Sequence, residues 1–345
     1  MNDFRFIDLF AGIGGFRIAL ESVGGKCVFS SDNDKFAQQT YHANFGEIPY
    51  GDIRSIDKKD IPDHDVLCAG FPCQPFSIAS IPKRNSLGMA HGFTDTTRGT
   101  LFFDVAEVIH VKRPKVFFLE NVKNLLSHDK GNTFRVISDA LTRLGYEFNF
   151  KVVDGANWTP QHRERIFIVG YDKKRFDIEK ERIIIPLGPL PGYQYPKLRT
   201  ILNKFVSGYT LGDGTWNALK AHKARHAAKG NGFGYSLVTF PIAEDKTTRT
   251  MSARYHKDGG EILIEQAGDN PRKLTIEEAM QLQGYDPKTF KFPVSRTQAY
   301  KQIGNSVVIP AIQATAREIS KVLTNYRQNG ASTSETDFKR MAQVS

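Results

Sequence analysis

The sequence predicts an α/β fold: a doubly wound, mostly parallel sheet accompanied by a small, irregular, mostly-β second domain. Up to about residue 186, short apolar runs of strand length alternate with amphipathic helical patterns, and a glycine-rich turn follows the first run. Beyond that point the periodicity weakens, and the chain becomes rich in Gly, Thr, Lys and aromatic residues up to about residue 270. Strands that alternate with helices favour a parallel sheet covered on both faces.

The strands of the first region are apolar runs at residues 4–10, 26–32, 63–71, 115–121, 147–154 and 165–171. Helical patterns lie between them at residues 16–24, 98–111 and 132–146. Pro114 ends the second of these patterns, and Gly145 is placed to cap the third. The second pattern predicts one apolar helix face, made of Leu101, Phe102, Val105, Val108 and Ile109.

A Pro/Gly linker at residues 186–196 opens the second region. Helical patterns return at 275–284, where Thr275 and Glu278 are spaced as a capping box, and at 308–323. The last pattern places apolar residues on one face, namely Ile309, Ile312, Ala316, Ile319 and Leu323. The tail at 328–345 is predicted to be disordered because it is polar and lacks periodicity.

The charge of the chain is concentrated in the second region. The formal net charge is +10, and residues 187–260 hold 11 Lys or Arg against 4 Asp or Glu. A local basic excess is typical of proteins that bind nucleic acid or another polyanion, although a well-solvated basic face gives the same composition.

Composition also bears on the compartment. Three cysteines are too few for a disulfide framework and favour a reducing, cytoplasmic setting. No apolar run approaches the roughly 18 residues that span a bilayer, and no secretory signal pattern opens the chain, so we expect no membrane association.

A glycine turn with a downstream carboxylate indicates a cofactor site. The segment "DLFAGIGGF" at 8–16 follows the first predicted strand and opens a helix, where free backbone N–H groups can meet a ligand. Asp32 ends the second strand, a position where a carboxylate takes the hydroxyls of a ribose. This pattern favours an adenosine-containing cofactor, and its spacing is not GxGxxG; a purely structural turn remains the alternative.

Three further positions carry candidate chemistry at predicted strand ends. Cys73 in "GFPCQPFS" is held between two prolines, which suits a fixed nucleophile, although a small buried hydrophobe is the commoner role of a cysteine. Glu120 follows four apolar residues, so burial should raise its pKa and let it exchange a proton near neutral pH, unless it is solvated or caps a helix. Arg163 and Arg165 alternate on a strand and so share a face that suits a carboxylate, a phosphate or a base edge.

A metal site is not expected. His222 and His226 lie one helical turn apart, but no nearby cysteine or carboxylate completes a tetrahedral zinc set. A basic helix that faces nucleic acid is the favoured interpretation of this segment.

Taken together, six ordered motifs between about residues 4 and 323 resemble those of the DNA (cytosine-5) methyltransferases. "DLFAGIGG" is similar to the family's S-adenosylmethionine loop, "GFPCQPFS" to its nucleophile motif, "ENV" to its catalytic acid and "QHRERIFIVG" to its paired arginines. "RKLTIEEAMQLQGY" and "QAYKQIGNSVVIPA" resemble the two C-terminal motifs. The resemblance implies a sheet of the S-adenosylmethionine-dependent methyltransferase type, S-adenosylmethionine as cofactor and double-stranded DNA as partner.

The resemblance also assigns roles to individual residues. Cys73, Glu120, Arg163 and Arg165 would be catalytic, with Cys73 adding to C6 of a flipped-out cytosine while Glu120 protonates or hydrogen-bonds N3. Asp32 stands where the family usually has Glu, and Asn33 where it often has an aromatic residue. A mobile loop at 77–99 would close over the base. The implied cofactor pocket consists of Phe10, Gly12, Gly14, Asp32, Asn33, Asp52, Ile53, Gly70, Pro72, Leu101, Asn305 and Val307.

The family pattern implies a domain division as well. Residues 1–186 and 286–327 would form the catalytic domain, because the last helix folds back beside the first strand, and 187–285 the target-recognition domain and hinge. The recognition region resembles Dcm-type enzymes, which methylate CCWGG; Thr250-Met251 replaces their common Thr-Leu. Candidate DNA-binding residues are Lys220, Lys223, Lys229, Arg249 and Arg254.

We therefore expect a monomeric, cytoplasmic restriction-modification methylase whose cognate endonuclease acts on the same site without being a stable partner. Two alternatives stay open at this point: an RNA cytosine-5 methyltransferase on the same fold, and a catalytically inactive DNA-binding relative.

Overall fold

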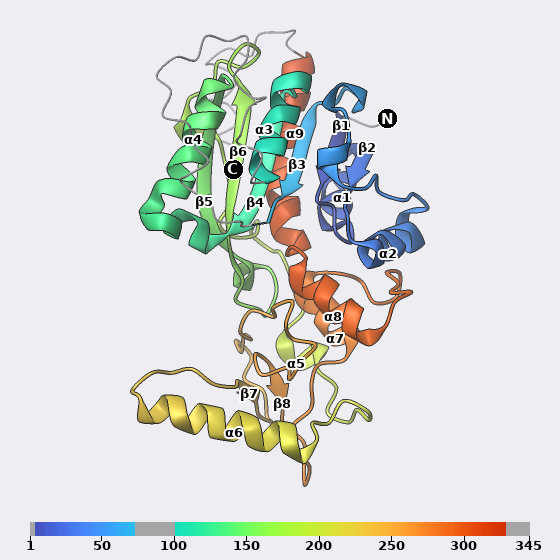
Figure 1. The fold of residues 1–345 in the computed structure, drawn as a ribbon, viewed down its shortest axis with the longest axis vertical. Helices are drawn as coiled ribbons and strands as arrows, with labels where there is room; N and C mark the ends of the chain where they lie inside the picture. Colours follow the sequence, from blue (N-terminus) through green and yellow to red (C-terminus); the bar gives the residue numbers. More distant parts are fainter. Residues whose placement is uncertain (1–3, 73–100, 329–345) are drawn as a thin grey trace.

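The structure, a computed structural model, describes residues 4–72 and 101–328. Its centre is a six-stranded sheet of order β2-β1-β3-β4-β6-β5 (Figure 1). The strands are β1 (Phe4–Leu9), β2 (Gly25–Ser31), β3 (Val66–Gly70), β4 (Val116–Val122), β5 (Tyr146–Asp154) and β6 (Glu164–Asp172). Neighbours from β2 to β4 pair in parallel, whereas β6 is antiparallel to β4 and to β5. The predicted mostly parallel sheet is confirmed.

Helices cover both faces of the sheet (Figure 1). They are α1 (Gly15–Glu21), α2 (Lys35–Phe45), α3 (Leu101–Lys112), α4 (Asn132–Arg143) and α9 (Ile309–Gln328). One buried cluster joins Cys68 of β3 to Ile312 of α9, and the other joins Leu67 of β3 to Val105 of α3 and Ile137 of α4. Because successive strand residues point to opposite faces, β3 supplies both halves of the core.

Helix α2 is absent from the sequence prediction. Its two ends nevertheless carry ordinary capping residues. The carboxylate of Asp34 accepts from Phe36 N and Ala37 N at the N-terminus, and Gly46 ends the helix in the left-handed conformation. The helix buries only Ala37, Thr40 and Tyr41, so its apolar periodicity is too weak to predict a helix from the sequence.

Short 3-10 turns connect the larger elements, at Ile53–Ser55, Lys58–Asp60, Lys123–Leu126, His128–Gly131, Gly155–Asn157 and Lys180–Arg182. Among the described residues, no helix is both long enough and apolar enough to cross a membrane.

The second region forms the lower part of Figure 1 and has little regular structure. Its elements are α5 (Leu198–Ile201), α6 (Asp213–Ala228), β7 (Leu237–Val238), β8 (Leu263–Ile264), α7 (Ile276–Gln283) and α8 (Arg296–Asn305). The expected irregularity is present, but the expectation of mostly β structure is corrected, since the described strands have two residues each and α6 has 16. Ala, Leu and Lys favour helix in α6, while the Gly-rich and Thr-rich segments form only short pairings.

A buried ion pair fixes the centre of this region. The guanidinium of Arg272 donates to both carboxylate oxygens of Glu278 at 2.7 and 2.8 Å, with both side chains almost fully buried. The same carboxylate accepts from Thr275 N, and the Thr275 hydroxyl accepts from Glu278 N. The predicted capping box is therefore confirmed, with Arg272 added to it.

The end of the chain returns to the sheet. Gln313 of α9 donates to the Ser22 hydroxyl at 2.8 Å, and Ser320 donates to the Val23 carbonyl at 3.1 Å. Thr40 of α2 donates to Gln302 of α8 at 2.8 Å. Helix α9 thus packs against α1, and α8 lies beside α2.

Candidate active site

Four parallel strands end at one edge of the sheet. The pairings Leu9↔Ser31 and Leu9↔Ala69 place the ends of β1, β2 and β3 side by side, and Gly70 of β3 pairs with Glu120 of β4. Ligands of doubly wound folds bind in the crevice at this edge. The register therefore brings the glycine turn, the residues after β2 and Glu120 together.

The glycine turn after β1 has the backbone that a ligand loop requires. Phe10, Gly12 and Gly14 all have positive φ, of 57°, 55° and 85°. A Cβ added at Gly14 would lie 2.3 Å from the Phe45 ring, so only glycine fits there. At Gly12 an added Cβ meets no described heavy atom within 4 Å, so space for a ligand lies above the loop.

Asp32 connects this loop to the end of β2. Its carboxylate accepts from Gly12 N and from Asp34 N, both at 2.8 Å. Burial raises the pKa of Asp32 above its usual value, against the lowering effect of these two hydrogen bonds. A carboxylate has about four acceptor positions, so two remain for hydroxyl donors such as those of a ribose.

Asp52 and Ile53 follow on the same side. Ile53 is buried, which suits an apolar wall for a planar ring. The Asp52 carboxylate is bound by Arg54, whose Nη2 approaches it to 2.5 Å, and this hydrogen bonding lowers the pKa of Asp52 to about 2. Asp52 is therefore an ionised acceptor in the structure.

The remaining cofactor candidates are spread over three segments. Val307 lies against the glycine turn, since a Cβ added at Gly15 would lie 2.7 Å from its side chain. Gly70 lies beside Glu120, whereas Pro72 and Asn305 are exposed. Leu101 is the first residue of α3 and packs against the buried cluster on that face. Gly70 and Val307 therefore line the same strand edge as the glycine turn.

Glu120 is held beside an arginine in a dry environment. Only 8% of Glu120 is exposed, and Nε of Arg165 lies 3.2 Å from its Oε1. Burial raises the pKa of Glu120, while the cations Arg165 and Arg163 partly offset that rise. A carboxyl group in this setting can hold a proton closer to neutral pH than an ordinary glutamate.

Arg163 has a different environment from Arg165. Its guanidinium donates to the carbonyls of Met251, Gly304 and Ser306 at 3.1, 3.0 and 2.6 Å. Burial and the neighbouring Arg165 cation lower the pKa of Arg163, yet a guanidinium surrounded by three carbonyls stays protonated. Its donors therefore join three chain segments, and its charge acts on Glu120 from nearby.

Cys73 and the loop at 77–99 lie outside the described residues. The chain just before Cys73 is fixed, because the Asn121 side chain donates to the Phe71 carbonyl at 2.8 Å. Asn121 follows Glu120 directly, so the backbone leading to Cys73 runs past the candidate acid.

Two buried residues of the site have no role in the sequence prediction. Gln161 donates to the Leu282 carbonyl at 3.0 Å and accepts from Met251 N at 2.7 Å, so it ties the segment before β6 to the second region at two points. Asp8 lies within the buried run of β1, and burial raises its pKa well above the usual value of a carboxyl group. A polar residue inside an otherwise apolar run was the available signal for Asp8.

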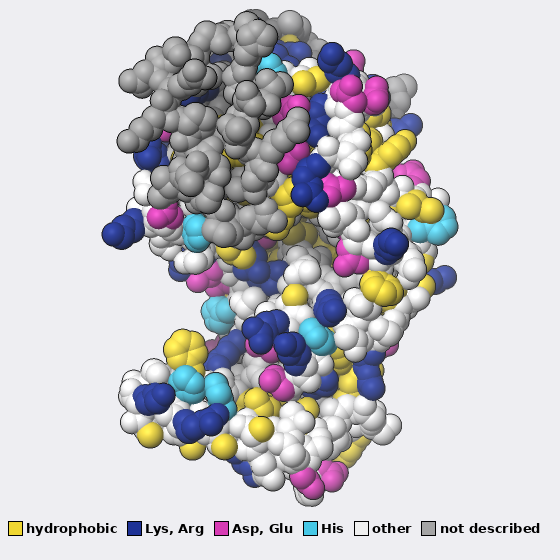
Figure 2. All heavy atoms as spheres, in the orientation of Figure 1, with side chains coloured by type: hydrophobic (Ala, Val, Ile, Leu, Met, Phe, Trp, Pro, Cys, Tyr) yellow, Lys and Arg dark blue, Asp and Glu magenta, His cyan; other side chains and the backbone are white. Residues whose placement is uncertain are grey.

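The candidate DNA-binding residues belong to the second region. Figure 2 shows the molecule hollowed between its large upper part and the arm that carries α6, with Lys and Arg side chains gathered around the hollow. Lys220 lies over the Trp216 ring and Lys223 over the Tyr235 ring, at 5.5 and 4.3 Å. These cations sit on an entirely unburied helix.

The other three candidates differ in how they are held. Arg249 donates to the Gly234 carbonyl at 2.8 Å. Lys229 follows the end of α6 and is exposed. Arg254 is exposed, and its backbone N–H is bound by the Ser252 hydroxyl at 3.1 Å. An exposed guanidinium on a fixed turn is suited to reading a base edge.

The sheet, the glycine turn and the acid after β2 define the class: the fold is that of the S-adenosylmethionine-dependent methyltransferases. A solved structure of Dnmt2 methyltransferase from S. pombe has the same fold, with a TM-score of 0.68 at 18% identity over 93% of this chain and 98% of that chain.

The family follows from the sequence comparisons. The model of the C-5 cytosine-specific DNA methylases matches residues 4–321, and the chain belongs to this family. Type II methyltransferase M.SsoII from Shigella sonnei is 49% identical, over 93% of this chain and 81% of its own length. DNA-cytosine methyltransferase from Escherichia coli (strain K12) is 43% identical, over 91% of this chain and 77% of its own length. The chain is thus a DNA cytosine-5 methyltransferase, and its family and fold imply S-adenosylmethionine as methyl donor.

Proposed function

We propose that this enzyme methylates C5 of a cytosine flipped out of a short, specific duplex site, through a covalent bond between Cys73 Sγ and C6 of the base. The observation that carries the proposal is the buried Glu120 carboxyl, paired with Arg165 at 3.2 Å beside the segment that leads to Cys73. A proton donor at N3 must lie in such a place for attack at C6 to become favourable.

The residues at the strand edge fit S-adenosylmethionine. The two remaining acceptor positions of Asp32 suit the ribose hydroxyls, and Asn33 follows Asp32 directly. The open space above Gly12 suits the methionine part of the cofactor. Ile53 and Phe10 offer apolar surface for the adenine, and the ionised Asp52 accepts from its amino group. When bound, S-adenosylmethionine supplies an electrophilic methyl group.

The protein's own groups perform the remaining chemistry. The Cys73 thiolate forms a bond to C6, and the electrons of the C5–C6 double bond become available at C5 as Glu120 protonates or hydrogen-bonds N3. C5 then bonds the methyl group, whose bond to the donor's sulfonium would break with the electron pair staying on sulfur. A base removes the C5 proton, the C5–C6 double bond re-forms and the Cys73 thiolate leaves. Arg165 holds the Glu120 carboxyl in position through this sequence.

We further propose that residues 187–285 form the target-recognition domain and hinge, and that 1–186 with 286–327 form the catalytic domain. The contacts of α9 with α1 support this division. We propose a recognition sequence of the CCWGG kind, because residues 216–237 and 247–264 resemble the recognition region of Dcm-type enzymes.

The Type II names of several relatives support a restriction-modification role. We propose in addition a cognate endonuclease that shares the target but forms no stable complex. Within this proposal the enzyme acts as a cytoplasmic monomer on double-stranded DNA. Sedimentation of the free and DNA-bound enzyme tests the monomer: a dimer in both states would contradict it.

Methyl transfer is tested with tritiated S-adenosylmethionine, unmethylated duplex DNA and tRNA. We expect incorporation into the duplex alone, and bisulfite sequencing of the product should place the modified cytosine in one short motif. Incorporation into tRNA, or into cytosines without a common context, would contradict the proposal.

The covalent step has its own test. A duplex with 5-fluorocytosine at the target blocks loss of the C5 substituent, so the enzyme should stay attached through Cys73 after denaturation. Cys73→Ser should give no adduct while still binding DNA. An adduct formed by the serine variant would place the nucleophile elsewhere.

A further inference from the structure

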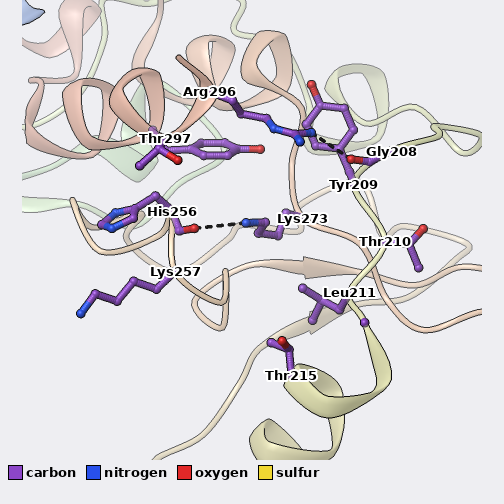
Figure 3. A pocket seen from close by; sticks show the side chains of 12 residues that line it. Gly208, Tyr209, Thr210, Leu211, Thr215, His256, Lys257, Lys273, Arg296 and Thr297 are labelled. Carbon is purple, nitrogen blue, oxygen red and sulfur yellow. Dashed lines mark hydrogen bonds between the residues drawn. The ribbon is translucent and has the colours of Figure 1, made fainter. Parts of the chain in front are cut away.

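A polar cavity of about 300 Å³ lies in the second region, and none of the strand-edge residues lines it. Figure 3 shows the side chains of its walls. Its walls come from three segments: the loop 208–212 with the start of α6, the turn at 256–257 with Lys273, and the first turns of α8. A cavity of this volume lies at the lower end of the range of small-ligand sites.

The cavity is lined by cations without carboxylates. Arg296, Lys273 and Lys257 contribute to its walls, and none of the described lining residues is acidic. Among the described residues, none of these three side chains forms an ion pair; their fixed contacts are with neutral groups. Arg296 donates to the Gly208 carbonyl at 2.9 Å, and Lys273 donates to the His256 carbonyl at 3.2 Å (Figure 3).

Aromatic rings orient two of these cations. The Arg296 guanidinium lies 4.8 Å from the Tyr209 ring centre, and the Lys273 ammonium lies 5.5 Å from that of Tyr300. Burial and the Arg296 charge lower the pKa of Lys273, while the charge of Asp258 raises it. The two cations therefore repel each other across a half-buried space, and an anion between them would relieve that repulsion.

Two helices also begin at this cavity. Thr297 belongs to the first turn of α8, and Thr215 to the first turn of α6. The residue before α6 is Gly212, which provides no side-chain cap for the first N–H groups. The positive ends of both helix dipoles add to the charge of the side chains, although Asp213 in the first turn of α6 and the Ser295 cap of α8 offset part of that contribution.

We propose that this cavity binds a phosphate group, supplied by the backbone of the DNA next to the recognition site. The source rests on the proposed function, since His256 and Lys257 stand on the same turn as Arg254, the candidate base reader. A phosphate in the cavity would fix the register of that turn on the duplex, because phosphate contacts set position and base contacts set sequence. Free inorganic phosphate has the same chemistry and is the other source to be tested.

Gly212 allows a test in which folding is held constant. Its φ is −67°, and an added Cβ meets no described heavy atom within 4 Å, so a side chain fits without strain. Gly212→Asp and Gly212→Asn both provide a cap for α6 and have the same shape, but only Asp brings a negative charge to the cavity. The difference between these two variants therefore isolates the charge.

We expect Gly212→Asp to bind target duplex about tenfold more weakly than Gly212→Asn in 0.1 M salt, with a salt slope reduced by about one. Lys257→Gln should reduce the salt slope as well, whereas Lys26→Gln, on the far strand β2, should not. Equal affinity and equal slope for the Asp and Asn variants would overturn a DNA phosphate in the cavity.

Two further measurements distinguish the source of the phosphate. In the first, a series of duplexes is prepared in which one phosphate at a time is replaced by a neutral methylphosphonate. At one position the replacement should weaken binding of the duplex by Gly212→Asn and leave binding by Gly212→Asp unchanged. Separately, inorganic phosphate at constant ionic strength should raise the melting temperature of Gly212→Asn if the free ion is bound. A melting effect without a discriminating methylphosphonate would assign the cavity to free phosphate and overturn the DNA source.

Absence of both effects would overturn the phosphate site altogether. Methyl transfer by the unmodified enzyme is measured in parallel, because failure of that reaction would contradict the proposed function, whereas active variants of equal affinity would contradict only the cavity.

Discussion

Arg163 at the start of β6 donates to the carbonyl of Ser306 at 2.6 Å, across 143 residues of chain. The same guanidinium reaches the carbonyls of Gly304 and Met251, so one side chain joins the sheet, the end of α8 and the second region. Planar forked donors suit this role, and an ammonium cannot reproduce it.

Arg163→Lys should therefore distinguish the effect of the carbonyl contacts of Arg163 from the effect of its positive charge. The variant keeps a cation near Glu120 but loses at least two of the three carbonyl contacts, each worth about 1.5–3 kcal/mol for a charged donor. We expect the free energy of unfolding to fall by about 3 kcal/mol in urea titrations. Arg165→Lys, which affects the ion pair with Glu120 and a contact with the neighbouring Glu164 carbonyl, is the matched control and should lower the free energy of unfolding less. Equal losses would contradict the crosslinking role.

Glu120→Gln should slow methyl transfer by about 10²–10⁴ while leaving DNA affinity within a few fold. The pKa of Glu120 is raised by burial, so in the native enzyme the acid form is lost as pH rises through that value. Single-turnover rates should therefore decline on the alkaline side for Glu120, and this limb should disappear in Glu120→Gln. The same alkaline limb in both proteins would assign it to another group.

We predict that some cations of the second region contact base edges and that others contact DNA phosphates. Arg254→Ala should change the choice of sequence, since a bidentate contact to guanine contributes about 1–3 kcal/mol of discrimination. Lys223→Ala should weaken binding to all sequences alike and reduce the salt slope by about one. Methylation of CCWGG and of its single-base variants at two salt concentrations checks both. An equal loss at every site for Arg254→Ala would make it a phosphate contact.

His64 predicts a pH dependence of stability. Its Nδ1 donates to the Pro62 carbonyl at 2.8 Å, and burial and Lys112 lower its pKa to about 4, against the opposing charges of Asp65 and Asp63. Because the folded pKa lies below the unfolded value of about 6.5, the stabilisation is present above pH 6.5 and is lost as pH falls towards 4.

The loss amounts to about 3 kcal/mol at most. His64→Asn retains the Nδ donor without titrating, so its unfolding free energy should decline less over this interval than that of the unmodified protein. Parallel declines would show that the carboxylates, and not His64, carry the acid sensitivity.

The elements with strong apolar periodicity, and the motifs at their ends, could be predicted from the sequence. The six strands and the apolar faces of α3 and α9 follow from local patterns, and the strand ends bring Glu120 and the glycine turn to one edge. Local patterns could not give the antiparallel direction of β6 or the partners of Arg163, because both depend on segments far apart in the chain. A basic helix around His222 and His226 was expected and is present as α6, but the extent of α6 could not be read from apolar periodicity because none of its residues is buried.

The return of α9 to the sheet determines the order in which the protein can be completed during synthesis. Ile312, Ala316 and Ile319 supply part of the core that α1 and the first strands share, yet a ribosome makes them some 300 residues later. Until they emerge, one apolar face of the sheet stays open to solvent, and Val307 is missing from beside the glycine turn. The nascent enzyme therefore lacks a complete cofactor cleft until nearly its whole length has been translated, and truncation before Val307 removes part of the core together with one side of that cleft.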